Sequence, residues 1–305
     1  MFFRNLTLFR FSPAVAAGLD GLEEALAAHR LRPCGPLELA TGGFVPPVGR
    51  GEAAALVHAV NDCHGFCVGS EEKILPAAVV NDELARRLEQ IAEEDGRRVG
   101  GRERKRLKEA VYAELLPRAF VRGSRLSGYL DRRQGWLVLD TASRKAAENA
   151  LTRLREALGS FPALPPAPEE SPRALMTEWL GSGNLPGELA LGDECELRDP
   201  AGATGAVVKC RRQALDADEV KEHLRNGKQV FQLGLVFDER MSFVLGEDLV
   251  VRKLKFLDAV TEELPDSPED AAAEADAAFA LLTLELERLF ARMEAWFGLA
   301  RPAES

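Results

Sequence analysis

Residues 81–116, NDELARRLEQIAEEDGRRVGGRERKRLKEAVYAELL, contain the pattern that decides how this chain is organised. Two charged segments with apolar residues at helical spacing lie on either side of the Gly100–Gly101 pair. Apolar residues three and four positions apart share one face of a helix, and a short glycine connection suits an αα-hairpin. The stretch therefore predicts two helices that pack against each other through Leu84, Leu88 and Ile91 on the first and Leu107, Val111 and Leu115 on the second.

The sequence on both sides of this helical pair has the pattern of strands. Short apolar or alternating runs bounded by turn residues are expected as strands at Asn5–Phe11, Ala53–Val60, Gly65–Gly69, Ser127–Leu130 and Gly135–Asp140. Helical spacing predicts helices over 13–30 and 143–159. The expected fold class is α+β, with antiparallel or mixed sheets and an inserted, projecting helical hairpin.

A proline-rich segment separates this region from the rest of the chain. Residues 161–172, FPALPPAPEESP, contain five prolines and are expected to be a linker. Beyond it, strands are expected at Glu188–Leu191, Gly205–Lys209, Gln229–Phe237, Met241–Leu245 and Leu249–Phe256, and helices near Ala174–Leu180, at Asp216–Asn226 and from Ser267 to about Phe297. We therefore expect three domains: a central one (1–76 and 120–162), a helical tip (77–119) and a base (163–305).

Composition limits the class of protein. The 305 residues are 46% apolar and 29% charged, and no run approaches the roughly 20 apolar residues that span a bilayer, so a cytoplasmic protein without a membrane segment is expected. The five cysteines are odd in number and irregularly spaced, which favours free thiols. No phosphate-binding loop, dinucleotide, hydrolase or zinc-protease motif occurs, and the group Cys63, His64 and Cys67 has no second ligand pair. Neither an enzyme nor a cofactor nor a bound metal is expected.

Charge is strongly segregated although the formal net charge is −10. Residues 97–133 hold twelve Lys or Arg against four Asp or Glu, an excess of +8, whereas residues 261–305 hold three against eleven, an excess of −8. A concentrated basic region favours binding of a polyanion such as DNA. Two alternatives stay open: a solvated helix face, and a protein-interaction module in which the basic and acidic regions of two copies meet without a DNA site.

A second basic group follows a predicted strand at Lys209-Cys210-Arg211-Arg212-Gln213. Strand alternation would place Lys209 and Arg211 on one face and Cys210 and Arg212 on the other. Arginine and glutamine at a strand end suit a phosphate backbone or a base edge, whereas the plainer interpretation is an edge strand protected by charge.

Seven short motifs occur in an order and at a spacing that resemble one known family. They are Phe3–Leu6, Cys34–Gly35, Gly43–Pro47, Glu71–Pro76, Leu115–Phe120, Thr177–Trp179 and Arg252–Phe256. Together they resemble the RdgC family of bacterial recombination-associated proteins, from the first residues to the C-terminal helix.

The resemblance implies a cytoplasmic, nucleoid-associated protein without catalytic activity that binds DNA with little sequence preference and restrains the recombinase RecA. It implies a ring-shaped homodimer with a positively charged hole for double-stranded DNA; binding of single-stranded DNA stays open. Each subunit would have a central domain, a helical tip and a base, with contacts between subunits at tip and base.

The resemblance also assigns candidate site residues. It places Arg118, Phe120, Arg211, Arg212 and Gln213 in or near the path of the DNA, with arginines at 211 and 212 where the family has lysines. The neighbours Arg122 and Lys209 join this candidate set because they extend the same two basic groups. Phe120 has two interpretations: a ring that intrudes between bases, or a core residue that closes the base of the hairpin.

Overall fold

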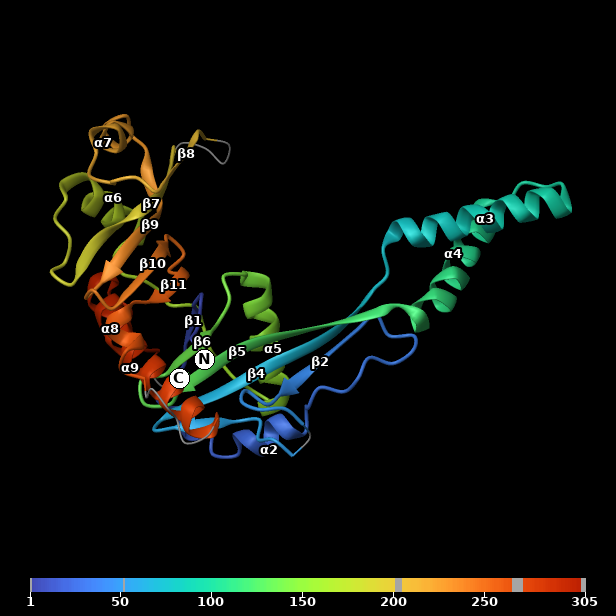
Figure 1. Ribbon diagram of the computed structural model, residues 1–305, viewed down its shortest axis with the longest axis horizontal. Coiled ribbons are helices and arrows are strands. Elements are labelled where there is room, and N and C mark those ends of the chain that lie inside the picture. Colours follow the sequence, from blue (N-terminus) through green and yellow to red (C-terminus); the bar gives the residue numbers. More distant parts are fainter. Residues whose placement is uncertain (1, 52, 201–204, 265–270, 303–305) are drawn as a thin grey trace. The chain divides into compact units, whose positions relative to one another are not determined.

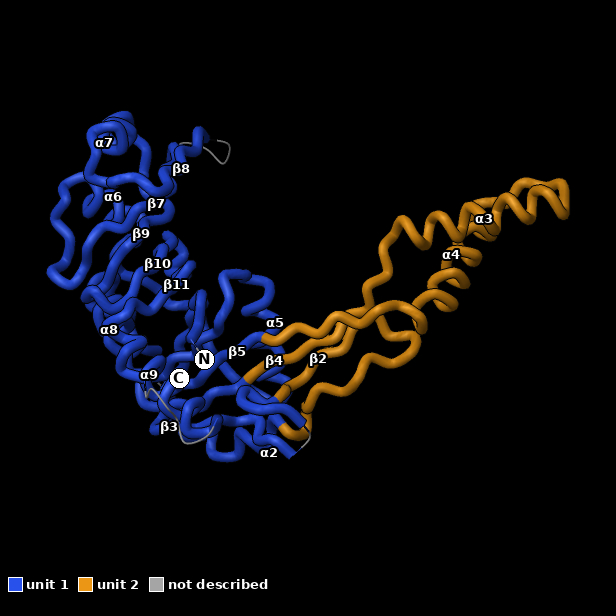
Figure 2. The backbone as a smooth tube through the Cα atoms, viewed as in Figure 1, with its two compact units in different colours: residues 1–26, 46–66, 126–305 blue, residues 27–45, 67–125 orange. Residues whose placement is uncertain are grey.

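The computed structural model describes residues 2–51, 53–200, 205–264 and 271–302, and within them the chain forms two compact units (Figure 2). Unit 1 comprises Met1–Leu26, Pro46–Phe66 and Leu126–Ser305, and unit 2 comprises Ala27–Val45 and Cys67–Arg125. The expected division into central, tip and base domains stays a prediction.

The fold is α+β with antiparallel sheets, as the sequence predicts (Figure 1). One sheet has the order β1-β6-β5-β4-β2, with β3 paired to β4. Its strands are β1 (Thr7–Arg10), β2 (Ala40–Val45), β3 (His58–Val60), β4 (Cys63–Ile74), β5 (Phe120–Asp131) and β6 (Trp136–Leu139). The strands β4 and β5 are much longer than the short strands expected at Gly65–Gly69 and Ser127–Leu130, because their exposed ends lack the apolar alternation that identifies a strand in a sequence.

Two expectations for the N-terminal third are wrong. The helix expected over 13–30 is two short helices, α1 (Pro13–Ala17) and α2 (Leu22–Ala27), because glycines at 18 and 21 interrupt it. Most of the strand expected at Ala53–Val60 is irregular: the backbone amides of Leu56 and Val57 donate to the Glu23 carboxylate at 2.7–3.0 Å, and only β3 pairs.

Strand β2 was not expected, because its two glycines hide the strand pattern. Gly43 is required there: a Cβ atom at this position would lie 2.6 Å from the carbonyl oxygen of His29 and 2.5 Å from the amide nitrogen of Leu31. Close backbone approach, and not side-chain alternation, therefore places this strand.

Between β4 and β5 the chain forms the two helices that the opening stretch predicts, α3 (Ala77–Asp95) and α4 (Gly101–Leu115), followed by the short 3₁₀ helix η1 (Leu116–Arg118). Val80, Leu84 and Val111 are buried, and Leu88, Ile91, Leu107 and Leu115 are half-buried. Arg87 on α3 pairs with Glu114 on α4, so polar contacts add to a narrow apolar contact.

The second sheet lies in unit 1 and has the order β11-β10-β9-β7-β8. Its strands are β7 (Leu189–Arg198), β8 (Val207–Arg211), β9 (Gln229–Phe237), β10 (Met241–Gly246) and β11 (Val251–Phe256). The last three lie at the expected places, whereas β7 extends seven residues beyond the expected end at Leu191 and β8 lies two residues later than expected. The helices α5 (Arg144–Leu158), α6 (Pro172–Ser182), α7 (Asp218–Arg225), α8 (Asp258–Thr261) and α9 (Ala271–Phe297) complete the unit. The expected start of the last helix at Ser267–Asp270 lies outside the described residues.

The N-terminal segment and α9 join the parts of unit 1. Leu6 exchanges backbone hydrogen bonds with Val251 at 2.8 and 3.0 Å, which ties the start of the chain to β11. Buried side chains of α9 contribute to the common core, namely Leu282, Leu286, Leu289, Phe290, Met293 and Phe297. The two ends of the chain therefore stabilise the same unit.

The proline-rich segment is packed and is not a loose linker. Phe161 is 1% exposed and contacts Phe11, with ring centroids 5.4 Å apart. Leu164 exchanges backbone hydrogen bonds with Arg10 at 2.7 and 3.0 Å, and Arg155 donates to the carbonyl oxygens of Phe161 and Ala163. Prolines here fix an extended backbone that lies along β1.

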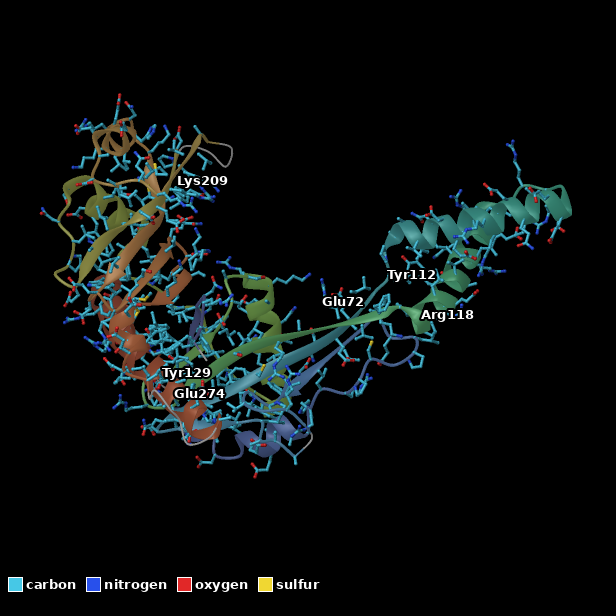
Figure 3. The ribbon with its side chains drawn as sticks, in the orientation of Figure 1. Glu72, Tyr112, Arg118, Tyr129, Lys209 and Glu274 are labelled. Atoms are coloured by element: carbon cyan, nitrogen blue, oxygen red, sulfur yellow. The ribbon has the colours of Figure 1, made fainter. Side chains whose placement is uncertain are left out.

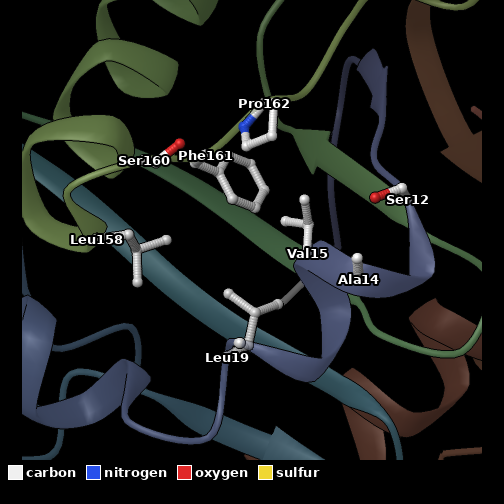
Figure 4. A pocket seen from close by; sticks show the side chains of 9 residues that line it. Ser12, Ala14, Val15, Leu19, Leu158, Ser160, Phe161 and Pro162 are labelled. Atoms are coloured by element: carbon white, nitrogen blue, oxygen red, sulfur yellow. The ribbon is translucent and has the colours of Figure 1, made fainter. Parts of the chain in front are cut away.

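Phe161 also lines a cavity of about 400 Å³ in unit 1, together with Val15, Leu19 and Leu158 (Figure 4). None of the expected DNA-contact residues lines this cavity.

Candidate nucleic-acid interface

Phe120 begins β5, separated from η1 by Ala119, and is 84% exposed, so the interpretation of this ring as a core residue is wrong. Pro117 lies in the short 3₁₀ helix η1 and has no backbone N–H to continue the hydrogen bonds of helix α4. The helix therefore ends here, and the chain continues into strand β5. The turn leaves the ring of Phe120 in solvent.

The arginines next to Phe120 differ in their partners. Arg118 is exposed and forms no ion pair with any described residue. Its charge still reaches Glu114, whose pKa is lowered first by a hydrogen bond from Arg87 and in smaller part by Arg118. Arg122 pairs with Glu72 of β4 at 2.7 Å, with both side chains more than half exposed. The positions of Arg118 and Glu72 can be found in Figure 3. An exposed pair of this kind contributes about 0–1 kcal/mol, so a phosphate can compete for Arg122.

Two side-chain contacts give the register of β4 and β5 in unit 2. The hydroxyl oxygens of Ser70 and Ser124 lie 2.7 Å apart, and Glu72 faces Arg122. Because side chains two residues apart in a strand share a face, the next opposed pair on this face is Ile74 and Phe120. Ile74 is itself 47% exposed, so Phe120 has an apolar neighbour that the sequence pattern did not reveal.

The basic residues of α4 and its preceding turn are mostly unpaired. Arg97 donates to Glu103 at 2.8 Å and to Asp95 at 3.1 Å, and these hydrogen bonds, led by that to Glu103, raise its pKa. In the described parts of the chain, no ion pair is formed by Arg98, Arg102, Arg104, Lys105, Arg106 or Lys108. Most of the positive charge of this segment is available to an external anion.

The second basic group lies on and after β8, in unit 1. Lys209 is engaged, since its Nζ lies 2.9 Å from Oε2 of Glu196, a residue that Arg198 also contacts. Burial acts to raise the pKa of Glu196, but the hydrogen bonds from Lys209 and Arg198 outweigh it and the pKa is lowered. Lys209 therefore neutralises the buried carboxylate of Glu196, and this ion pair reduces the capacity of Lys209 to bind another anion.

Arg211 and Arg212 are exposed and form no ion pair with the described residues. The expectation that Arg212 shares a face with Cys210 is wrong. The strand ends at Arg211, and Arg212 has a φ of 53°, a left-handed turn that breaks the alternation. Gln213 is partly engaged: its backbone N–H donates to Asp193 and its side-chain amide lies 3.4 Å from Glu219.

The structure thus groups Arg118, Phe120 and Arg122 in unit 2, and Lys209, Arg211, Arg212 and Gln213 in unit 1. Across the described residues, no three His, Cys, Asp or Glu side chains are arranged to hold a metal ion. No helix within those ranges is long and apolar enough to cross a membrane.

Comparison with known sequences identifies the protein family of the chain. A family model described as "Putative exonuclease, RdgC" matches residues 1–300. The chain belongs to the RdgC family.

Full-length RdgC relatives are about half identical to it. The "Recombination-associated protein RdgC" of Xanthomonas axonopodis pv. citri (strain 306) is 49% identical over 302 residues, covering 99% of both chains. Its namesake in Xanthomonas campestris pv. campestris (strain B100) is 51% identical over 295 residues, or 96% of this chain and 97% of the relative. That of Xylella fastidiosa (strain M12) is 50% identical over 302 residues, covering 99% of both. The family resemblance of the seven motifs is confirmed, and the relatives' name associates the RdgC family with recombination.

Proposed function

We propose that this chain binds DNA without marked sequence preference. The observation that carries the proposal is the exposed ring of Phe120 beside the unpaired Arg118. An aromatic ring in solvent can stack on a base, while adjacent guanidinium groups contact phosphates. Two exposed arginines after β8, Arg211 and Arg212, supply a second set of phosphate contacts.

The unpaired cations of α4 support the same proposal. Binding to DNA neutralises phosphates and releases condensed counterions, so clustered Lys and Arg provide affinity that does not depend on base sequence. The net charge of −10 works against binding elsewhere on the protein, which restricts DNA to the basic surfaces.

The resemblance leads us to propose a ring-shaped homodimer that encircles double-stranded DNA. In this proposal each subunit is divided into a central domain (1–76 and 120–162), a projecting helical tip (77–119) and a base (163–305). A ring on the duplex would occupy the template on which a recombinase filament grows. We therefore propose that the protein limits RecA-mediated recombination by occupancy, on the nucleoid in the cytoplasm.

The proposed activity is binding and not cleavage. The matching family model is described as a "putative exonuclease", whereas the three relatives of this chain named above are called recombination-associated proteins. The chain has none of the hydrolase motifs considered above. End-labelled duplex incubated with the protein and magnesium is expected to keep its full length; progressive shortening would contradict the proposal.

The decisive experiment is a titration of duplex binding against salt concentration. We expect a linear fall of log affinity with log salt, and each of Arg118→Ala, Arg211→Ala and Arg212→Ala is expected to reduce the slope by about 1. Arg225→Ala on α7 is the matched control, because it removes an exposed arginine outside the candidate site and is expected to leave the slope unchanged. A flat dependence for the unaltered protein would favour the interaction-module alternative.

A further inference from the structure

Two buried cysteines face each other in the second sheet. Cys195 on β7 is the direct cross-strand partner of Cys210 on β8. The two residues are 4% and 9% exposed. Both are free cysteines.

The backbone spacing at this pair suits a disulfide. Directly opposed residues of an antiparallel pair have Cα atoms about 4.5 or 5.5 Å apart, and disulfides span about 4.4–6.8 Å between Cα atoms. Closing the bond between Cys195 and Cys210 therefore requires side-chain rotation and little movement of either strand.

The other three cysteines lack such a partner, and all five lie in the described ranges. Cys67 is opposed by Val45 and Cys63 by Val60. Cys34 donates from Sγ to the carbonyl oxygen of Glu38 at 3.2 Å. Cys63 and Cys67 are four residues apart on one strand, about 13 Å along its axis. The opposed arrangement is specific to Cys195 and Cys210.

A small polar cavity reaches the pair. It has a volume of about 140 Å³ and is lined by Cys195 and Cys210 together with Lys209, Arg211, Lys253 and Glu194. The two cysteine side chains belong to the apolar core, so a peroxide has to reach them through opening of the edge strand β8. Burial, followed by the neighbouring thiol, raises the pKa of Cys195 to about 12, which keeps the thiolate scarce at neutral pH and makes the reaction slow.

We propose that Cys195 and Cys210 are a site of reversible oxidation, at which a peroxide converts the two thiols into a cross-strand disulfide. One sulfur, as thiolate, attacks the peroxide O–O bond and takes one oxygen as a sulfenic acid, while the other oxygen leaves as water. The second sulfur then displaces the sulfenic hydroxyl, which also leaves as water, and the S–S bond forms. Two thiols and one peroxide thus give one disulfide and two waters, and a dithiol reductant reverses the change by exchange.

The bond would restrain a strand at the edge of the sheet. β8 is the outermost strand of its sheet and pairs only with β7 in the described part of the chain. A covalent link at Cys210 would hold β8 to β7 next to Lys209 and Arg211. The oxidation itself does not depend on the proposed DNA binding.

The experiment treats the full chain with hydrogen peroxide, alkylates the remaining thiols and maps the peptides by mass spectrometry. We expect loss of the two thiols at 195 and 210, an intrachain cross-linked peptide that is two hydrogen atoms lighter, and recovery of both thiols after reduction. Cys34→Ser should keep the cross-link, and Cys195→Ser should lose it.

Hydrogen exchange gives a second measurement that needs no variant. Exchange of the β8 amides is expected to slow by roughly tenfold on oxidation, with return to the starting rate after reduction. Survival of both thiols in peroxide, sulfinic acid at either cysteine without a cross-link, or disulfides only between chains would each overturn the proposal.

Discussion

Phe120 exposes 84% of its surface, although phenylalanine is among the residues most often buried. Its opposed neighbour in unit 2, Ile74, is also exposed, at 47%. An exposed group of large apolar side chains next to unpaired arginines is typical of a surface that binds another molecule. With so much of its surface in solvent, the ring contributes little to the packing of the described residues.

Phe120→Ala is therefore expected to weaken DNA binding and leave folding intact. A stacked base is worth about 1–3 kcal/mol, so affinity for a short duplex or single strand should fall by roughly 5- to 150-fold. Fluorescence anisotropy measures the affinity, and thermal unfolding measures the stability. Val121→Ala serves as control, because the adjacent side chain points to the opposite face of β5. Unchanged affinity for Phe120→Ala would remove the ring from the interface.

Strand β1 and helix α9 are joined by an ion pair whose arginine is buried and whose glutamate is half-buried. Arg10 is 4% exposed, its Nη1 lies 2.7 Å from Oε1 of Glu294, and its guanidinium lies 3.9 Å above the ring of Trp136. Burial lowers the pKa of Arg10, and Glu294 opposes that shift. Arg10 depends on Glu294, because a buried charge without a partner loses its hydration without compensation.

Removing Glu294 alone is expected to destabilise unit 1, because it leaves Arg10 charged and buried. Glu294→Gln should lower the free energy of unfolding by about 3–5 kcal/mol, Arg10→Met by less because the half-buried Glu294 keeps part of its hydration, and the double variant by less than the sum of the two. Urea unfolding of the four proteins measures the coupling. Asp218→Ala, which breaks an exposed pair with Arg225, is expected to cost less than about 1 kcal/mol. Additive losses at Arg10 and Glu294 would show that the pair is not coupled.

For the whole molecule, the distribution of charge matters more than its total. A chain with a net charge of −10 still presents an excess of +8 over residues 97–133. Such segregation can attract DNA to one surface while the remaining surface repels it. In the proposed homodimer, the closed ring around the duplex would keep the protein on DNA for longer than phosphate contacts alone.

A closed ring on DNA predicts a difference between circular and linear duplex. We expect twice the mass of one chain in solution, and slower dissociation from a closed circle than from a linear duplex of equal length when salt is raised, because sliding off needs a free end. Blocking both ends of the linear duplex should restore retention. Equal dissociation rates from circle and open linear duplex, measured by filter retention, would contradict encirclement.

The sequence was sufficient where a local pattern is strong. Helical spacing located α5 and the pair α3 and α4, the apolar runs located β9, β10 and β11, and the motifs with their order revealed the family. The helices and strands depend on neighbours within a few residues, so the sequence alone predicts them. The family depends on the order of short motifs, which the sequence also contains.

Other features depend on segments that meet only in the folded chain. Glu72 becomes the partner of Arg122 from 50 residues away, β2 exists because Gly43 admits the backbone of 29–31, and Cys195 meets Cys210 through the register of two strands. The exposure of Phe120 belongs with them. A phenylalanine after a helix has the same local pattern whether it is buried or in solvent, because only the packing of distant residues decides how much of the ring water can reach.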